Sequence, residues 1–237
     1  VVGNDVQCVV AVGGELRSRK GLNLPGIDLG ISAFTERDRE CLEFALEHGV
    51  DAVSQSFVES AADIEAVRRA AREMGHDPFV IAKIERAGAI EHYREILAAA
   101  DGVMVARGDL GVEVPIEELP ILQRRIVSKC VHLGRKVIVA THMLESMISA
   151  PVPTRAEMTD AANAVFETAD AIMLSGETSV GKYPVLCVEI LDRIARRAEL
   201  AGRDEGSPAE HAELRTDKQK IVRAAVSLAN SLQHAHL

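Results

Sequence analysis

The sequence predicts an α/β fold, with parallel strands of the (β/α) barrel type, from three observations. First, short runs rich in β-branched residues alternate with longer amphipathic segments, which indicates parallel strands joined by crossover helices. Second, the strand-like runs are apolar on both faces, as expected where each side of a sheet is covered. Third, nearly every run ends in polar residues, and such residues at the carboxyl ends of parallel strands form the active site of a (β/α) barrel.

The elements follow from the periodicity and from the signals at their ends. The expected strands are Val50–Phe57, Phe79–Ile84, Gly102–Ala106, Lys136–Thr141 and Asp170–Ser175. The expected helices between them include Arg37–Glu47, Asp63–Glu73, Ala89–Ala99, Glu118–His132 and Arg155–Glu167. Capping-box patterns that begin at Thr35, Ser60 and Thr154 predict helix starts, and Gly49, Gly75 and Gly134 predict helix ends. A doubly wound nucleotide-binding sheet is the alternative, but the glycine-rich motifs of such sheets are absent from the sequence, which favours the barrel.

Composition excludes several classes of protein. Lys and Arg number 27 against 36 Asp and Glu, a net charge of −9, which argues against a nucleic-acid partner bound through a broad basic face. The sequence contains no apolar run near the ~20 residues that span a membrane, so we expect no membrane partner. Four widely spaced cysteines without a C-x-x-C pair indicate buried free thiols, and hence a cytoplasmic location. The chain starts at Val1 without Met, so we expect a processed start or a piece of a longer protein.

One group of polar residues suggests chemistry at the strand ends. Lys83 and Glu85 lie two apart on an expected strand, so their side chains point to the same side. Asp109 follows the neighbouring strand, about 4.8 Å away. Two carboxylates so placed suit Mg²⁺, and a lysine beside them can stabilise a transferring phosphoryl group or an enolate. A Lys–Glu ion pair with a purely structural role explains the spacing equally well.

Three further motifs leave a functional and a structural interpretation open. The turn at Arg107–Asp109 carries Gly108, whose small size lets backbone N–H groups approach an anion, although an ordinary βα turn fits too. Thr141 ends a strand and could bind a carboxylate or relay a proton, whereas for His142 a satisfied structural histidine is the simpler expectation. Glu177 belongs to a loop that weakly resembles a phosphate or metal site, with an ion pair to a strand-end cation as the alternative.

Five motifs, in order and with matching spacing, resemble the pyruvate kinase family. They are IAKIE at 81–85, DGVMVARGDLGVE at 101–113, ATHMLESM at 140–147, PTRAE at 153–157 and DAIMLSGET at 170–178. The similarity runs from about Val1 to Leu200. It implies a partial (β/α)8 TIM barrel of pyruvate kinase type over residues 26–200, comprising strands 4–8 of the family's barrel. It also implies the tail of a small β lid domain over residues 1–25, and a linker with the first helix of a C-terminal domain over residues 201–237.

The resemblance implies phosphoryl transfer from phosphoenolpyruvate to ADP, which gives pyruvate and ATP in glycolysis. Carried over by position, it implies that Lys83 and Thr141 are catalytic, that Lys83, Arg107, Gly108, Asp109 and Thr141 bind substrate, and that Glu85 and Asp109 hold Mg²⁺. It also implies a K⁺ ion whose ligands lie outside this chain, and a homotetramer for the intact protein.

The sequence also departs from the family pattern. His142 stands where most members have Gln, and Glu59 stands where many have Arg or a neutral residue. The first three strands of the family's barrel, with an Arg for the phosphate and much of the nucleotide site, would precede Val1. We therefore expect the isolated chain to be an incomplete and inactive portion. The alternatives are a Mg²⁺-dependent lyase that acts on pyruvate enolates on a related barrel, and a non-catalytic relative that acts as an assembly partner.

Overall fold

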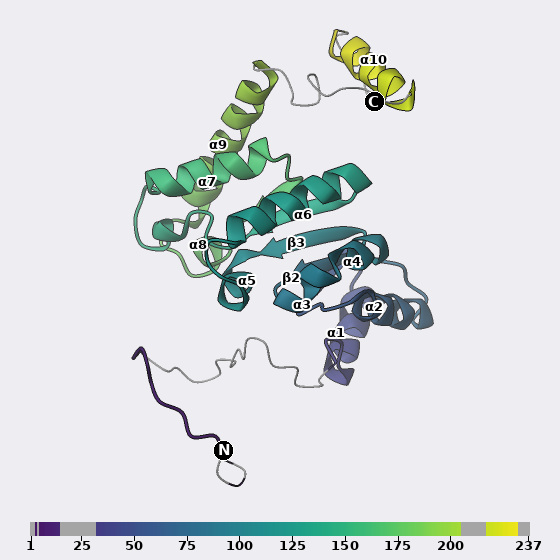
Figure 1. The fold of residues 1–237 in the computed structure, drawn as a ribbon, viewed down its shortest axis with the longest axis vertical. Helices are drawn as coiled ribbons and strands as arrows, with labels where there is room; N and C mark the ends of the chain where they lie inside the picture. The colour runs from purple at the N-terminus through teal and green to yellow at the C-terminus, as the bar shows by residue number, and fades with distance from the viewer. Residues whose placement is uncertain (1–2, 4, 15–31, 205–216, 232–237) are drawn as a thin grey trace.

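Within residues 3, 5–14, 32–204 and 217–231, which the computed structural model describes, five parallel strands form one sheet, of which β2 and β3 are labelled in Figure 1. The strands are β1 Ala52–Gln55, β2 Phe79–Ile84, β3 Gly102–Ala106, β4 Lys136–Ala140 and β5 Ala171–Met173. Their order in the sheet is their order in the chain. A doubly wound sheet would reverse this order at a switch point, so the uninterrupted order is that of a barrel wall. The expected fold class is confirmed.

The helices follow the strands and cover the sheet. They are α1 Glu36–Glu47, α2 Ala61–Glu73, α3 Ala87–Glu91, α4 Tyr93–Ala99, α5 Arg107–Glu113, α6 Leu119–Leu133, the 3₁₀ helix η1 Glu145–Ile148, α7 Arg155–Phe166, α8 Gly176–Ser179, α9 Pro184–Asp204 and α10 Asp217–Ser231. Helix α2 packs on β1 and β2, α6 packs on β3 and β4, and α7 packs on α9. Figure 1 shows α6 over β3 and α7 beside α9. No helix in the described ranges has the length and apolar character needed to cross a membrane.

The local signals at the helix ends act as expected. Thr35, Ser60 and Thr154 each form a capping box with the acidic residue three positions later. Gly134 ends α6 in the left-handed conformation, with φ 65°, which a residue without Cβ adopts at little cost.

Other boundaries differ from the expectations. The helix expected over residues 89–99 is two helices, because the backbone at His92 (φ −102°, ψ 7°) breaks the run and its carbonyl starts α4 by accepting N–H groups of Glu95 and Ile96. Helix α9 continues to Asp204 and α10 begins at Asp217, so, within the linker and helix expected over residues 201–237, residues 201–204 continue α9 and the described helix is α10. In the expected lid segment, Asp5 lies in a single β-bridge, 6–14 have no regular structure, and 15–25 lie outside the described residues.

The core is aliphatic and lies between the sheet and its helices. Alternate residues of β2, namely Val80, Ala82 and Ile84, are buried against the helices, while Ile81 and Lys83 between them are partly exposed. Only one face of β2 is therefore fully covered, whereas all five residues of β3 are buried, so the expectation of two covered faces holds for β3 but not for β2.

All four cysteines are free thiols, as expected, but only Cys130 and Cys187 are buried, whereas Cys8 and Cys41 are exposed. Burial, with a smaller contribution from the nearby carboxylate of Asp170, raises the pKa of the Cys130 thiol to about 12.

Candidate functional site

Lys83 and Glu85 meet at the carboxyl end of β2, as their spacing predicts. The Lys83 ammonium lies 2.6 Å from Oε1 of Glu85 and donates to the hydroxyl of Ser56 at 3.1 Å. Glu85 is 1% exposed, whereas Lys83 is 25% exposed. The pair thus combines a buried carboxylate with a cation that still reaches solvent. This geometry is compatible with both a structural ion pair and a catalytic lysine.

The second oxygen of Glu85 is held by a strained segment of backbone. The N–H of Phe57 donates to Oε2 at 2.7 Å, and Phe57 has a φ of 54°. A bulky residue in the left-handed region costs about 1–3 kcal/mol, and such strain persists where the surroundings enforce it. The two donors offset the cost of burying the charged Glu85 carboxylate.

Asp109 lies in the first turn of α5, just beyond the end of β3. Ile84 pairs with Val105 in the sheet, so Glu85 and Asp109 follow the ends of adjacent strands. Asp109 is exposed and forms no ion pair or hydrogen bond with the residues that the structure describes. Over those same residues, no group of three or more His, Cys, Asp or Glu side chains could hold a metal ion. Carboxylate oxygens are the ligands that Mg²⁺ prefers, but both oxygens of Glu85 are bonded here, one to Lys83 and one to the Phe57 N–H.

The Arg107 side chain is engaged by the protein itself. It is 9% exposed and its Nη1 lies 2.6 Å from Oδ2 of Asp160 on α7. Its Nη2 donates to the carbonyl oxygen of Thr141 at 2.6 Å, and Nε donates to the same oxygen at 3.1 Å. The side chain is therefore committed to internal partners. A substrate at this position would therefore contact the backbone of Arg107 and not its side chain.

Thr141 and Gly108 join the ends of β4 and β3. The Thr141 hydroxyl accepts the Gly108 N–H at 2.7 Å and donates to the carbonyl oxygen of Ala140 at 2.6 Å. Thr141 and His142 have φ values of 68° and 54°, so two consecutive residues without glycine's freedom are left-handed. A carboxylate bound here would accept from the Gly108 N–H, which now donates to the Thr141 hydroxyl, and from that hydroxyl, which now donates to the Ala140 carbonyl oxygen.

Two of the structural interpretations at these strand ends are not observed. Among the residues that the structure describes, no cation pairs with Glu177; it is fully buried and accepts the N–H groups of Leu144 at 2.9 Å and Ser175 at 2.8 Å. Backbone N–H groups satisfy a buried carboxylate as well as a cation does, and the tight turn into α8 presents them. His142 is exposed and makes no hydrogen bond to a described residue, so it is not a satisfied structural histidine.

The structure also shows residues that sequence reasoning missed. Arg86 forms an ion pair with Glu59, the position already noted as a departure from the family pattern. Asp160 gave no sequence signal because its partner Arg107 is 53 residues away. Phe57 gave none because a bulky residue does not indicate a left-handed backbone.

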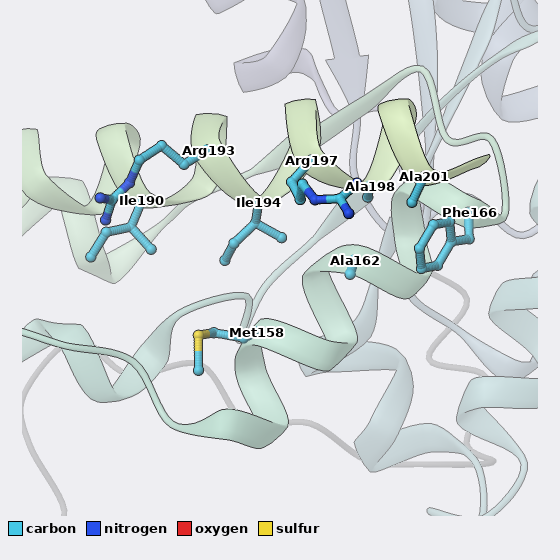
Figure 2. A pocket seen from close by; sticks show the side chains of 9 residues that line it. All are labelled: Met158, Ala162, Phe166, Ile190, Arg193, Ile194, Arg197, Ala198 and Ala201. Carbon is cyan, nitrogen blue, oxygen red and sulfur yellow. The ribbon is translucent and has the colours of Figure 1, made fainter. Parts of the chain in front are cut away.

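A separate shallow groove lies between α7 and α9, away from the strand ends. Figure 2 shows its lining, in which Met158, Ala162 and Phe166 of α7 face Ile190 and Ile194 of α9. Its volume is about 590 Å³, and Arg193 and Arg197 also line it. The groove is mostly apolar and contains none of the candidate site residues.

Comparison with known proteins identifies the family. The family model described as pyruvate kinase, barrel domain, matches residues 2–188. The pyruvate kinase of Thermococcus litoralis is 53% identical over 196 residues, which cover 83% of this chain and 41% of that protein. Pyruvate kinase 2 of Synechocystis sp. is 45% identical over 235 residues, which cover 99% of this chain and 39% of that protein. The pyruvate kinase of Corynebacterium efficiens is 51% identical over 203 residues, which cover 86% of this chain and 43% of that protein.

The chain thus spans about two fifths of the length of these curated relatives. The match covers all five strands and the residues Lys83, Glu85, Asp109 and Thr141 at their ends. The family match and the sequential parallel sheet agree, and the chain belongs to the pyruvate kinase family of phosphotransferases.

Proposed function

We propose that the intact protein transfers a phosphoryl group from phosphoenolpyruvate to ADP, giving pyruvate and ATP. The observation that carries the proposal is the partly exposed Lys83 ammonium, 2.6 Å from the buried Glu85, at the same sheet edge as Thr141 and Asp109. Phosphoryl transfer depends on positioning and on charge stabilisation more than on covalent chemistry by the protein. A cation anchored at a strand end is suited to that task.

Each residue has a role that its surroundings support. Lys83 has three N–H donors, so it can keep Glu85 and Ser56 while it stabilises a transferring phosphoryl group or an enolate oxygen. The backbone of 107–109 and the Thr141 hydroxyl bind the carboxylate of phosphoenolpyruvate or pyruvate. We also assign to Thr141 the relay of a proton to the enolate. Glu85 and Asp109 would hold Mg²⁺, which supplies positive charge to substrate oxygens when bound.

We further propose that the intact protein is a cytoplasmic homotetramer that uses Mg²⁺ and K⁺, with the K⁺ ligands outside this chain. The domain division proposed is lid tail over 1–25, barrel over 26–200, and linker with a C-terminal-domain helix over 201–237. The mostly apolar groove between α7 and α9 supports association (Figure 2).

The isolated chain is proposed to be inactive. In the described part of the chain, β1 and β5 are each paired on one side, so the sheet is not closed into a barrel. A lactate dehydrogenase-coupled assay with phosphoenolpyruvate, ADP, Mg²⁺ and K⁺ tests this, and turnover by the purified chain would contradict it.

A chimera tests the function itself. In it, this chain replaces the aligned segment of the Synechocystis relative, which supplies the remaining length. We expect turnover by the chimera, and a loss of at least about 100-fold in kcat on Lys83→Met, because the charge at the transferring group is removed. Lys136→Met is the matched control, since Lys136 pairs with Asp170 at the opposite end of the sheet. A folded chimera without transfer would refute the proposal, and retro-aldol cleavage without ADP would favour the lyase.

A further inference from the structure

The conformation of Thr141 needs an external support. A β-branched residue with φ 68° is a steric outlier, and the next residue, His142, is left-handed as well. Neither residue is glycine, so the local sequence does not favour this backbone. Contacts from elsewhere in the fold must hold the Thr141 hydroxyl against the Gly108 N–H at 2.7 Å.

Arg107 supplies the contact to Thr141. Its Nη2 and Nε groups donate hydrogen bonds to the Thr141 carbonyl oxygen at 2.6 and 3.1 Å. These two bonds fix the orientation of the peptide plane that follows Thr141. Because a guanidinium is planar and rigid, holding one of its edges fixes the direction of the other. Nη2 also lies 2.9 Å from the Met143 sulfur.

Asp160 holds the remaining edge of that guanidinium. Its Oδ2 lies 2.6 Å from Nη1, whereas Gln123 Oε1, the other acceptor near Nη1, is at 3.4 Å. Asp160 lies on α7 and is 38% exposed, so it can be changed without opening a large cavity. A contact from α7 therefore reaches the ends of β3 and β4 through a single buried side chain.

We propose that Asp160 is a positioning residue, which holds Arg107 so that Thr141 keeps the left-handed backbone that presents its hydroxyl at Gly108. The inference rests on the proposed function in one respect, the role of Thr141 as a substrate-binding residue. The alternative is that Asp160 only neutralises a buried arginine, in which case the geometry at Gly108 is independent of it.

The test is amide hydrogen exchange and backbone chemical shifts, measured by nuclear magnetic resonance on the full 237-residue chain. In Asp160→Asn we expect the Gly108 amide to exchange about tenfold faster and the Thr141 carbon shifts to leave left-handed values. Amides at the centres of β3 and β4 should not change. Asp192→Asn is the control, because Asp192 forms an Asp–Arg pair with Arg196 on the exposed side of α9. It should change Gly108 exchange less than twofold.

Asp160→Glu keeps the carboxylate, so we expect its Gly108 exchange rate and Thr141 shifts to lie between those of the original chain and those of Asp160→Asn. A folded Asp160→Asn variant with unchanged Gly108 exchange and Thr141 shifts overturns the proposal. If that variant does not fold, Asp160→Glu decides: changed Gly108 and His142 shifts support the proposal, and identical shifts overturn it.

Titration of the same samples with phosphoenolpyruvate separates the positioning role of Asp160 from the proposed function of the site. If the unaltered chain binds no phosphoenolpyruvate, the exchange result at Gly108 alone decides the positioning role, and the chimera decides the function. Binding that weakens at least fivefold in Asp160→Asn, but not in Asp192→Asn, supports both the proposed function and the positioning role.

Discussion

Glu177→Gln tests how the loops that follow β4 and β5 are held together. The Glu177 carboxylate is fully buried and accepts one N–H from each loop, at Leu144 and Ser175. A hydrogen bond to a charged group contributes about 1.5–3 kcal/mol, and a buried donor left without a partner costs about 1–3 kcal/mol. Glutamine keeps one acceptor oxygen and turns an NH₂ group toward the second donor. We therefore expect a loss of about 3 kcal/mol in the free energy of unfolding.

Urea unfolding followed by circular dichroism measures this loss, with the m-value compared to confirm that the same surface is exposed. Glu145→Gln is the matched control, since Glu145 is exposed on η1 and its change should stay within about 0.5 kcal/mol. If Glu177→Gln also stays within that range, the two N–H bonds do not secure the loops and the reasoning fails.

Three other predictions follow from the structure. The Cys130 thiol, whose pKa is raised by burial to about 12, should resist iodoacetamide at pH 8 in the folded chain; mass-spectrometric labelling there would contradict this. Burial acts to raise the pKa of Asp101, but a backbone N–H and the Arg68 guanidinium outweigh it and hold that pKa below 3.8. The stability that ionised Asp101 contributes should be fully present above about pH 3.8 and be lost as the pH falls through the lowered pKa of the folded state. In urea unfolding, the difference in free energy of unfolding between the original chain and Asp101→Asn should therefore shrink below about pH 3.8. Gly181→Ala would place a Cβ 2.2 Å from a carbonyl oxygen of α8, and we expect it to lower stability by about 2 kcal/mol in thermal unfolding. Gly202→Ala, with open space around it, should show no loss.

The fold was largely predictable because its signals are local. β-branched runs placed β2 and β3 at the boundaries observed, and capping boxes placed the starts of α1, α2 and α7 within about two residues. The errors fall where tertiary contacts decide the structure. Nothing in the expected helix over 89–99 indicates a break at His92, and β5 is only three residues long because its pairing with β4 ends at Met173.

The candidate site was predictable only in part. The spacing of Lys83 and Glu85 was sufficient to place their side chains together, because residues two apart on a strand share a face. The partners of Glu177 and Arg107 were not predictable. Buried carboxylates and guanidinium groups bond to whichever backbone groups or charges the folded chain brings near them. Two of these partners, Leu144 for Glu177 and Asp160 for Arg107, lie 33 and 53 residues away in the chain.

The sequence by itself determined the strand–helix alternation, the aliphatic core and the collection of polar side chains at the strand ends. All of these follow from the side-chain pattern over short stretches, where the periods of helix and strand are set by backbone geometry. Only the tertiary structure decided that Phe57, Thr141 and His142 are left-handed and that Asp160 reaches Thr141 through Arg107. Local preference opposes such conformations, so long-range contacts must supply the energy that holds them.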